Sequence, residues 1–258
     1  MIKILLCGAS GAMGNWITEV VDQHPDFEIT CGLSLNGSLN SKFSTVSKFD
    51  SIDIKQINAI DVIIDFSNAT LTDQLLTFSV EHQLPLVLCT TGLSNETEIK
   101  VLEASEKIPI FKSGNMSLGI NVLSRVLKQA SIILGNLSDI DIVEKHHNRK
   151  VDAPSGTALM LAEATNSGLE VNRSIVLGRE KEGSKDQSVI NIHSVRGGNI
   201  VGEHEVIFSY DDERITFSHG AYSRRVFANG ALNAAHYIIK QKPGLYDMSQ
   251  MLDDMITL

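Results

Sequence analysis

One short loop concentrates the side chains that could do acid and anion chemistry. Residues 144–158 read EKHHNRKVDAPSGTA, and four basic or protonatable side chains fall within five positions, namely His146, His147, Arg149 and Lys150. Lysine and arginine donate charge-assisted hydrogen bonds to a carboxylate, and histidine can donate a proton near neutral pH. Three small residues then open a predicted helix whose first amides would face an anion, namely Ser155, Gly156 and Thr157. The loop therefore predicts a site for a small dicarboxylate that contains an acid.

Two other interpretations of this loop remain open. His146 and His147 could bind a metal ion, but adjacent side chains point to opposite sides of an extended chain. No other group of His, Cys and Asp in the sequence has the spacing of metal ligands, so no metal is predicted. The basic residues could also be a solvated charge run. The Ser-Gly-Thr turn beside them favours the anion site.

A glycine-rich turn near the N-terminus predicts a dinucleotide site. The segment KILLCGASGAMGNWITEVV places Gly8, Gly11 and Gly14 between an apolar strand and an amphipathic helix. Glycine suits this turn because a Cβ would block the tight bend and the approach of a pyrophosphate to the helix amides. A turn without a ligand is the alternative, and the strand and helix around it favour the nucleotide.

The sequence lacks, at the usual position, the side chains that distinguish NAD from NADP. An Asp or Glu about 20 residues beyond the turn commonly binds the ribose hydroxyls. Here the second predicted strand ends in CGLSLNGS, which offers Ser34, Asn36 and Ser38 and no carboxylate. The nearest cations that could bind a 2′-phosphate are Lys42 and Lys48. The sequence leaves the choice between NADH and NADPH open.

The elements that would position these residues begin with alternating strand-like and helix-like segments, which are typical of a parallel sheet with crossover helices. The predicted strands are Ile2–Cys7, Phe27–Leu33, Asp61–Phe66, Pro85–Cys89 and Ile108–Phe111. Loops at the carboxyl ends of such strands line the ligand crevice. The loop residues expected beside the cofactor are Phe66, Ser67, Thr90, Thr91 and Gly92, each of which could instead serve only its turn.

The chain beyond position 117 predicts a second domain. A helix is expected over 118–134, then the strand DIDIVEKH, the basic loop and a helix over 157–164. Three strand-like runs follow at short spacing, Val189–Val195, His204–Tyr210 and Arg214–His219. Consecutive strands with short connections favour a mixed or antiparallel sheet. A last amphipathic helix is expected over 227–240.

We therefore expect an α/β protein with two domains. A Rossmann-type, doubly wound parallel sheet would occupy residues 1–117 and bind the dinucleotide. An α+β domain with a mixed or antiparallel sheet would occupy residues 118–226 and bind the substrate. Residues 227–258 would return to the first domain.

Composition narrows the class of partner. The 258 residues carry a formal net charge of -9, whereas binding to nucleic acid or anionic membranes rests on summed positive charge, so neither partner is predicted. No apolar run approaches the roughly 18 residues of a membrane span or the form of a secretory leader, so a cytoplasmic protein is expected. Cys7, Cys31 and Cys89 form no CxxC pair and are expected to be buried, reduced thiols.

Together these segments resemble the dihydrodipicolinate reductase family of the lysine and diaminopimelate pathway. The resemblance covers nearly the whole chain and rests on GASGAMG, DFSNAT, TTG, GNMSLGIN, EKHHNRKVDAPSGTA, VRGGNIVGEHEV and FANGA, in this order. It implies NADH- or NADPH-dependent reduction of 4-hydroxy-tetrahydrodipicolinate to tetrahydrodipicolinate with loss of water. It also implies a homotetramer built through the sheet of the second domain.

The resemblance implies roles for individual residues. His146 would be the proton donor, and Lys150 would bind a substrate carboxylate and support the developing charge. The rest of the substrate site would be His147, Ser155, Gly156, Thr157 and Thr91. The family's cofactor contacts would fall at Gly8, Ala12, Met13, Phe66, Ser67, Ser113, Met116 and Arg224, and the motifs add Gly11, Gly14, Cys89, Thr90 and Thr91. Arg149 receives no role.

The sequence departs from the family pattern at two places. Asn36 and Gly37 stand where members often carry an acidic and then a basic residue, so the resemblance implies no cofactor preference. Cys89 stands where a glycine is common, which we expect to alter packing more than chemistry.

Two other functions fit the sequence less well. A nucleotide sensor without turnover would have no need of an acid beside its anion site. A semialdehyde dehydrogenase would need a cysteine nucleophile, and none of the three cysteines has a basic neighbour in the sequence.

Overall fold

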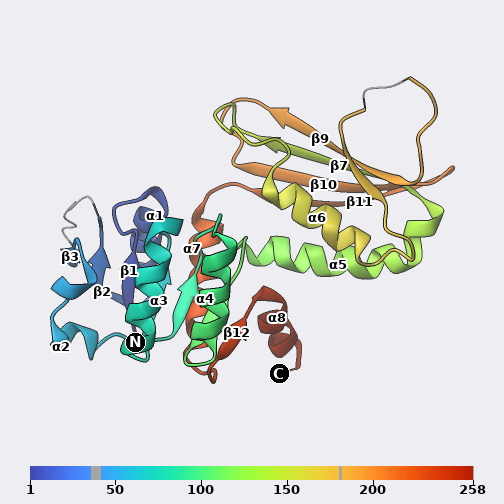
Figure 1. The fold of residues 1–258 in the computed structure, drawn as a ribbon. Coiled ribbons are helices and arrows are strands. Elements are labelled where there is room, and N and C mark those ends of the chain that lie inside the picture. The colour runs from blue at the N-terminus through green and yellow to red at the C-terminus, as the bar shows by residue number, and fades with distance from the viewer. Residues whose placement is uncertain (36–41, 180–181, 258) are drawn as a thin grey trace. The chain divides into compact units, whose positions relative to one another are not determined.

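The structure is a computed structural model that describes residues 1–35, 42–179 and 182–257 (Figure 1). The chain divides into two compact units. The first comprises Met1–Ser117 and Arg224–Leu258, and the second comprises Leu118–Ser223. Residue 226, the predicted domain boundary, lies inside helix α7 (Arg225–Ile238). Asn36, Gly37 and Ser38, on which the ribose prediction depends, lie outside the described residues.

The first unit is built on a parallel sheet. Its strands lie in the order β12-β6-β5-β4-β1-β2-β3, and every described pair is parallel. Their bounds are β1 (Ile2–Cys7), β2 (Phe27–Leu33), β3 (Ser44–Val46), β4 (Val62–Asp65), β5 (Leu86–Leu88), β6 (Pro109–Lys112) and β12 (Gly244–Tyr246). The order reverses between β1 and β4, and such a switch point is where open α/β sheets bind ligands. The predicted doubly wound fold is confirmed.

Helices cover both faces of this sheet. They are α1 (Ala12–Val21), α2 (Ile54–Ile57), α3 (Thr72–Glu81), α4 (Asn95–Ser105), α7 and α8 (Met248–Thr257), with short 3₁₀ turns η1 (Phe49–Ser51) and η2 (Ala69–Leu71). The crossover through α1 runs from β1 to β2 and the crossover through α3 runs from β4 to β5, in opposite directions along the sheet, so right-handed connections place the two helices on opposite faces. Helix α1 contacts α7, and α3 contacts α4. Apolar side chains such as Ile17, Leu75 and Val101 are buried against the strands.

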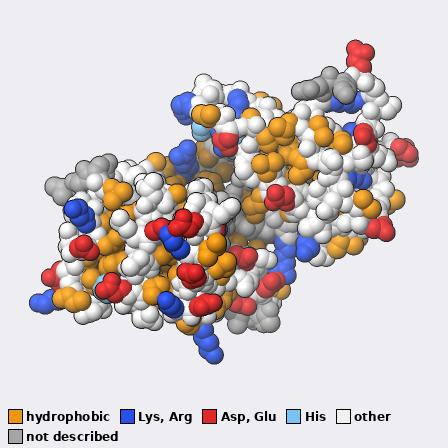
Figure 2. Space-filling view, viewed as in Figure 1, with side chains coloured by type: hydrophobic (Ala, Val, Ile, Leu, Met, Phe, Trp, Pro, Cys, Tyr) orange, Lys and Arg blue, Asp and Glu red, His pale blue; other side chains and the backbone are white. Residues whose placement is uncertain are grey.

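The outer surface of α3 and α4 is charged. Figure 2 shows acidic and basic side chains interspersed there. Lys100 of α4 forms ion pairs with Asp73 of α3 at 2.6 Å and with Glu96 at 2.9 Å. Among the described residues, no helix combines the length and apolar character needed to cross a membrane.

The second unit packs two helices on a mixed sheet (Figure 1). Its elements are α5 (Leu118–Leu134), η3 (Gly135–Leu137), β7 (Asp139–His146), α6 (Gly156–Asn166), β8 (Ser174–Leu177), β9 (Val189–Arg196), β10 (Gly202–Ser209) and β11 (Arg214–Ala221). The strands lie in the order β11-β10-β7-β9-β8. β10 is antiparallel to β7 and β11, whereas β9 is parallel to β7 and β8. The predicted mixed sheet is confirmed.

Several elements escaped the sequence analysis, among them strands β3, β8 and β12 and helices α2, α4 and α8. Strands β3 and β12 have three residues each and β8 has four. A run this short shows too few alternations to reveal a period of two, and all three strands are exposed or half-buried. Helix α8 follows β12 directly and buries Met248, Met251 and Leu252.

A glycine in α7 allows a close approach of two segments of the first unit. A Cβ at Gly230 would lie 1.6 Å from the carbonyl oxygen of Met116. We expect Gly230→Ala to lower the free energy of unfolding by about 1–3 kcal/mol, because the backbone must move. Helix propensity alone would raise it by about 1 kcal/mol, so the sign of the change is informative. Urea unfolding measures it. Gly114→Ala is the control, since a Cβ there meets nothing within 4 Å.

Candidate active site

The glycine turn of the first unit suits a dinucleotide phosphate. Gly8 directly follows β1 and has φ +78, and a Cβ there would lie 2.5 Å from the Phe66 carbonyl oxygen. A Cβ at Gly14 would lie 2.4 Å from the Gly8 carbonyl oxygen. Gly11 is the N-cap of α1 and makes no side-chain cap, and the first turn carries no acidic residue. The amides of Ala12 and Met13 are therefore suited to an anion.

A buried carboxylate joins two of the loops predicted to hold the cofactor. Asp65, at the end of β4, is fully buried. It accepts hydrogen bonds from the Ser67 amide at 3.1 Å, the Ser67 hydroxyl at 2.5 Å and the Thr90 hydroxyl at 2.6 Å. Burial raises the pKa of Asp65, and these hydrogen bonds partly offset the rise. Asp65 thus fixes the loops after β4 and β5 relative to each other.

The other residues predicted at the cofactor lie on the same unit. Thr91 is exposed just beyond β5, and the Ser113 hydroxyl after β6 donates to the Asn115 carbonyl at 2.9 Å. Met116 is buried, and Arg224 is exposed as the N-cap of α7. Burial, and then the charge of Asp65, raise the pKa of the buried Cys89 thiol. A thiol of this kind is a poor nucleophile, as the sequence analysis expected.

The candidate acid site of the second unit is built on strand β7, along which buried and half-buried side chains alternate. Ile140, Ile142, Glu144 and His146 are buried, whereas the residues between them are half-buried. Successive side chains of a strand point to opposite faces, so Glu144 and His146 continue the row that packs in the apolar core. The polar pair therefore closes one end of the core.

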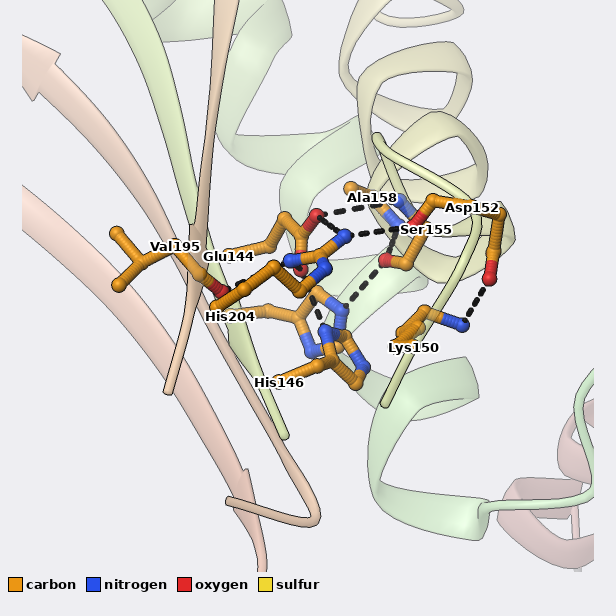
Figure 3. A network of polar contacts seen from close by, with 9 residues as sticks. Glu144, His146, Lys150, Asp152, Ser155, Ala158, Val195 and His204 are labelled. Atoms are coloured by element: carbon orange, nitrogen blue, oxygen red, sulfur yellow. Dashed lines mark hydrogen bonds and ion pairs between the residues drawn. The ribbon is translucent and has the colours of Figure 1, made fainter. Parts of the chain in front are cut away.

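Neighbouring strands and the start of α6 complete a polar cluster, which we define as Glu144, His146, Ser155, Arg196 and His204; all but the half-buried Arg196 are buried. His204 of β10 lies opposite Glu144, and Arg196 of β9 lies beside His146. The Nδ1 of His146 is 2.5 Å from Glu144 Oε2. Arg196 donates to both carboxylate oxygens of Glu144, at 2.9 and 2.7 Å. Figure 3 shows Glu144, His146 and His204 converging from the sheet with Ser155 from the start of α6.

The Glu144 carboxylate is ionised in this setting. It is fully buried, and burial alone would raise its pKa. The hydrogen bonds from Arg196, Ser194 and His146 outweigh burial and lower the pKa of Glu144 to about 2. The cluster therefore holds a permanent negative charge next to the His146 ring.

The start of helix α6 faces the cluster. Ser155 is the N-cap, and its hydroxyl accepts from the Ala158 amide at 3.1 Å. The Ser155 amide donates to Glu144 Oε1 at 3.3 Å, and its hydroxyl lies 3.2 Å from His204 Nε2. Gly156 and Thr157 form the first turn, as predicted. An N-terminus of this kind favours negative charge.

The loop between β7 and α6 carries the predicted substrate cation. The Lys150 ammonium forms an ion pair with Asp152 at 2.8 Å, and Figure 3 shows the two side chains beside the N-terminus of α6. His147 is half-buried. Arg149 is exposed and donates to Asn199 at 3.0 Å, which ties the loop to the turn between β9 and β10.

Burial gives His204 a distinctive pH dependence. Burial, followed by the nearby His146, lowers the pKa of His204 to about 4. Below the unfolded value of about 6.5 the unfolded chain therefore binds more protons than the folded one, so stability falls as pH falls. We expect a loss of about 3 kcal/mol between pH 6.5 and 4. Urea unfolding across this range measures it. His204→Gln should flatten this slope, whereas substitution of the exposed His24 by Gln should leave it unchanged.

The cluster also contains the one group in the described residues with metal-ligand spacing. The donor atoms of Glu144, His146 and His204 lie within 4.8 Å of one another. Both Glu144 oxygens already accept from the Arg196 guanidinium, however, which places a positive charge where a cation would need negative charge. This geometry suits a proton-transfer site better than a metal site.

Sequence reasoning missed Glu144, Arg196, His204 and Asp65. Glu144 had one usable signal, its position two residues before His146 on the same strand, which puts both side chains on one face. Arg196 and His204 come from other strands, so only the register of the sheet brings them to His146.

Comparisons with known proteins match nearly the whole chain. The family model described as dihydrodipicolinate reductase, N-terminus, matches residues 2–116, and the model described as dihydrodipicolinate reductase, C-terminus, matches residues 119–252. A 4-hydroxy-tetrahydrodipicolinate reductase from Caldanaerobacter subterraneus subsp. tengcongensis is 46% identical over 254 residues, which is 98% of each chain. One from Clostridium novyi is 42% identical over 252 residues, again 98% of each chain.

Solved structures share the fold. A dipicolinate-bound dihydrodipicolinate reductase from Paenisporosarcina sp. TG-14 superposes with a TM-score of 0.79 at 21% identity, covering 96% of this chain and 97% of the other. A probable dehydrogenase from Thermotoga maritima gives a TM-score of 0.62 at 12% identity, covering 97% and 92%.

Proposed function

Because this chain belongs to the dihydrodipicolinate reductase family, we propose that the loop after β7 supplies the acid and the carboxylate-binding cation of the family's reaction. That reaction is the NAD(P)H-dependent reduction of 4-hydroxy-tetrahydrodipicolinate to tetrahydrodipicolinate with loss of water, in lysine and diaminopimelate biosynthesis. The observation that carries the proposal is the buried His146, held by Glu144 beside the N-terminus of α6 and the Lys150 loop.

His146 is proposed as the proton donor. The reduced nicotinamide, when bound, supplies the hydride to the conjugated imine. Negative charge then develops toward the ring nitrogen, and an acid close to it stabilises the transition state more than the ground state. His146 is 8% exposed, so its proton has limited access to bulk water.

Lys150 and the start of α6 are proposed to bind the carboxylates. The Lys150 ammonium would exchange Asp152 for a substrate carboxylate, and Ser155, Gly156 and Thr157 would bind with their amides and hydroxyls. His147 completes the proposed substrate site of the second unit. The enzyme from Paenisporosarcina binds dipicolinate, a dicarboxylate, which supports a dicarboxylate site on this chain.

The first unit is proposed to bind the cofactor, and the second to bind the substrate. The glycine turn fits the pyrophosphate because its helix amides have no side-chain cap. The proposed cofactor residues are Gly8, Gly11, Ala12, Met13, Gly14, Phe66, Ser67, Cys89, Thr90, Thr91, Ser113, Met116 and Arg224. A cytoplasmic homotetramer is proposed from the family resemblance, and light scattering after gel filtration would measure the subunit number.

A coupled assay tests the function. The product of dihydrodipicolinate synthase is supplied with NADH or NADPH, and oxidation is followed by the loss of nicotinamide absorbance. We expect oxidation with at least one cofactor, and the ratio of the two rates reports the preference. If neither cofactor is oxidised, the assignment of this reaction to the chain is wrong.

A further inference from the structure

We propose that Glu144 and Arg196 form a positioning pair for His146, which holds the ring by Nδ1 and leaves Nε2 as the nitrogen that transfers the proton. The proposal rests on the proposed function, because it assigns how the acid of that reaction is oriented. Neither Glu144 nor Arg196 is required to touch substrate or cofactor.

The first step of the argument is the way Glu144 is fixed. Its two carboxylate oxygens accept a bidentate pair of hydrogen bonds from Arg196, and bidentate pairs of this kind fix both distance and plane. Arg196 is itself anchored, because it also donates to the Val195 carbonyl at 2.8 Å. The carboxylate has little freedom to turn away from His146.

The second step concerns the two ring nitrogens. Nδ1 of His146 lies 2.5 Å from Glu144 Oε2, so an ionised Glu144 keeps a proton on Nδ1 in both the charged and the neutral ring. The proton that leaves is then the one on Nε2. A Cβ at Gly202, at the start of β10, would lie 3.1 Å from Nε2. Glycine at this position therefore leaves space beside the transferring nitrogen.

The third step is the balance of charge around the ring. Arg196 approaches from β9, His204 from β10 and Lys150 from the loop, while Asp152 pairs with Lys150. Burial lowers the pKa of His204 and of His219 on β11, so both rings are neutral near pH 7 and the cations beside His146 are Arg196 and Lys150. Glu144 is the carboxylate in contact with the ring, so it stabilises the imidazolium that acts as the acid. Arg196 keeps Glu144 ionised and so prevents it from taking the proton.

Arg196 further connects the acid to the substrate loop. Its second guanidinium nitrogen donates to the Asp152 carbonyl at 2.7 Å, two residues from Lys150. Loss of Arg196 should therefore affect both proton transfer and substrate binding. Loss of the Glu144 charge, with the shape of the side chain kept, should affect proton transfer more than substrate binding.

The test compares kinetics and ring chemistry. Glu144→Gln keeps the shape but removes the charge, and we expect kcat to fall about 10- to 100-fold with KM changed less than about 3-fold. The pH above which activity declines should move to lower pH, and Glu144→Asp should restore part of kcat. Glu203→Gln is the control, because Glu203 pairs with Lys145 on the other face of the sheet and should leave all three readouts unchanged.

A measurement on the wild type keeps the proposal testable if Glu144→Gln does not fold. ¹⁵N NMR of histidine-labelled protein should show the neutral His146 ring protonated on Nδ1. A proton on Nε2 instead, or Glu144→Gln with wild-type kcat and pH profile, overturns the proposal. If the wild type oxidises neither cofactor, the proposed function is refuted. If the wild type is active and Glu144→Gln has the same kcat and pH profile, only the positioning role is refuted.

Discussion

We expect His146→Gln to lower kcat by about 100-fold or more while the affinity for NADH and NADPH stays near that of the wild type. General acids contribute on this scale, because the proton must reach the substrate as charge develops. Glutamine keeps a polar side chain of similar reach but cannot supply the proton. Nucleotide affinity is expected to persist because the proposed cofactor residues lie on the first unit, whereas His146 lies on the second.

Steady-state kinetics and calorimetric titration of each nucleotide measure the two effects. The matched control is His193→Gln. His193 is a half-buried histidine of the same sheet whose Nε2 contacts Asp141 at 3.3 Å, away from the cluster. The His193→Gln variant should retain the kcat of the wild type. Equal losses in both variants would indicate a general loss of structure, and an unchanged kcat in His146→Gln would remove this residue from the mechanism.

We expect Lys150→Ala to raise KM for the substrate and Kd for pyridine-2,6-dicarboxylate, each by about 10- to 100-fold. A hydrogen bond to a charged group contributes about 1.5–3 kcal/mol, and 1.4 kcal/mol corresponds to a factor of ten in affinity. The inhibitor binds through its carboxylates without being reduced, so its Kd isolates the binding role of Lys150 from any role in the chemical step.

Lys145→Ala is the matched control for this change. Lys145 lies on the same strand as His146, but it pairs with Glu203 and Glu205 on the opposite face of the sheet. Its loss should leave the Kd of the dicarboxylate unchanged. If Lys150→Ala and Lys145→Ala bind the inhibitor equally well, the carboxylate does not bind at Lys150.

The elements that could be predicted from the sequence are those whose pattern lies within one continuous segment of the chain. Long buried strands such as Ile2–Cys7 and DIDIVEKH were recognisable from apolar runs or alternation, and their observed bounds agree. The loop from His146 to Thr157 was recognisable because its basic residues and its helix start lie next to each other in the chain.

The residues that surround Glu144 and His146, the proposed acid, could not be predicted in the same way. Arg196 reaches Glu144 only because β9 pairs in parallel with β7 in one register, and a shift by one residue would turn its side chain to the other face. His204 depends likewise on the antiparallel register of β10. Strand order and register are set by the packing of the whole unit, so no local pattern encodes them.

The ion pair between Lys150 and Asp152 has a consequence for selectivity among anions. Without substrate, a carboxylate of the protein itself already neutralises the ammonium. A simple anion such as acetate or phosphate gains little by replacing Asp152, because one attraction is exchanged for another. Under the proposed function, a dicarboxylate would offset the exchange with its second group at the start of α6, so we expect the loop to discriminate by the number and spacing of charges on the ligand.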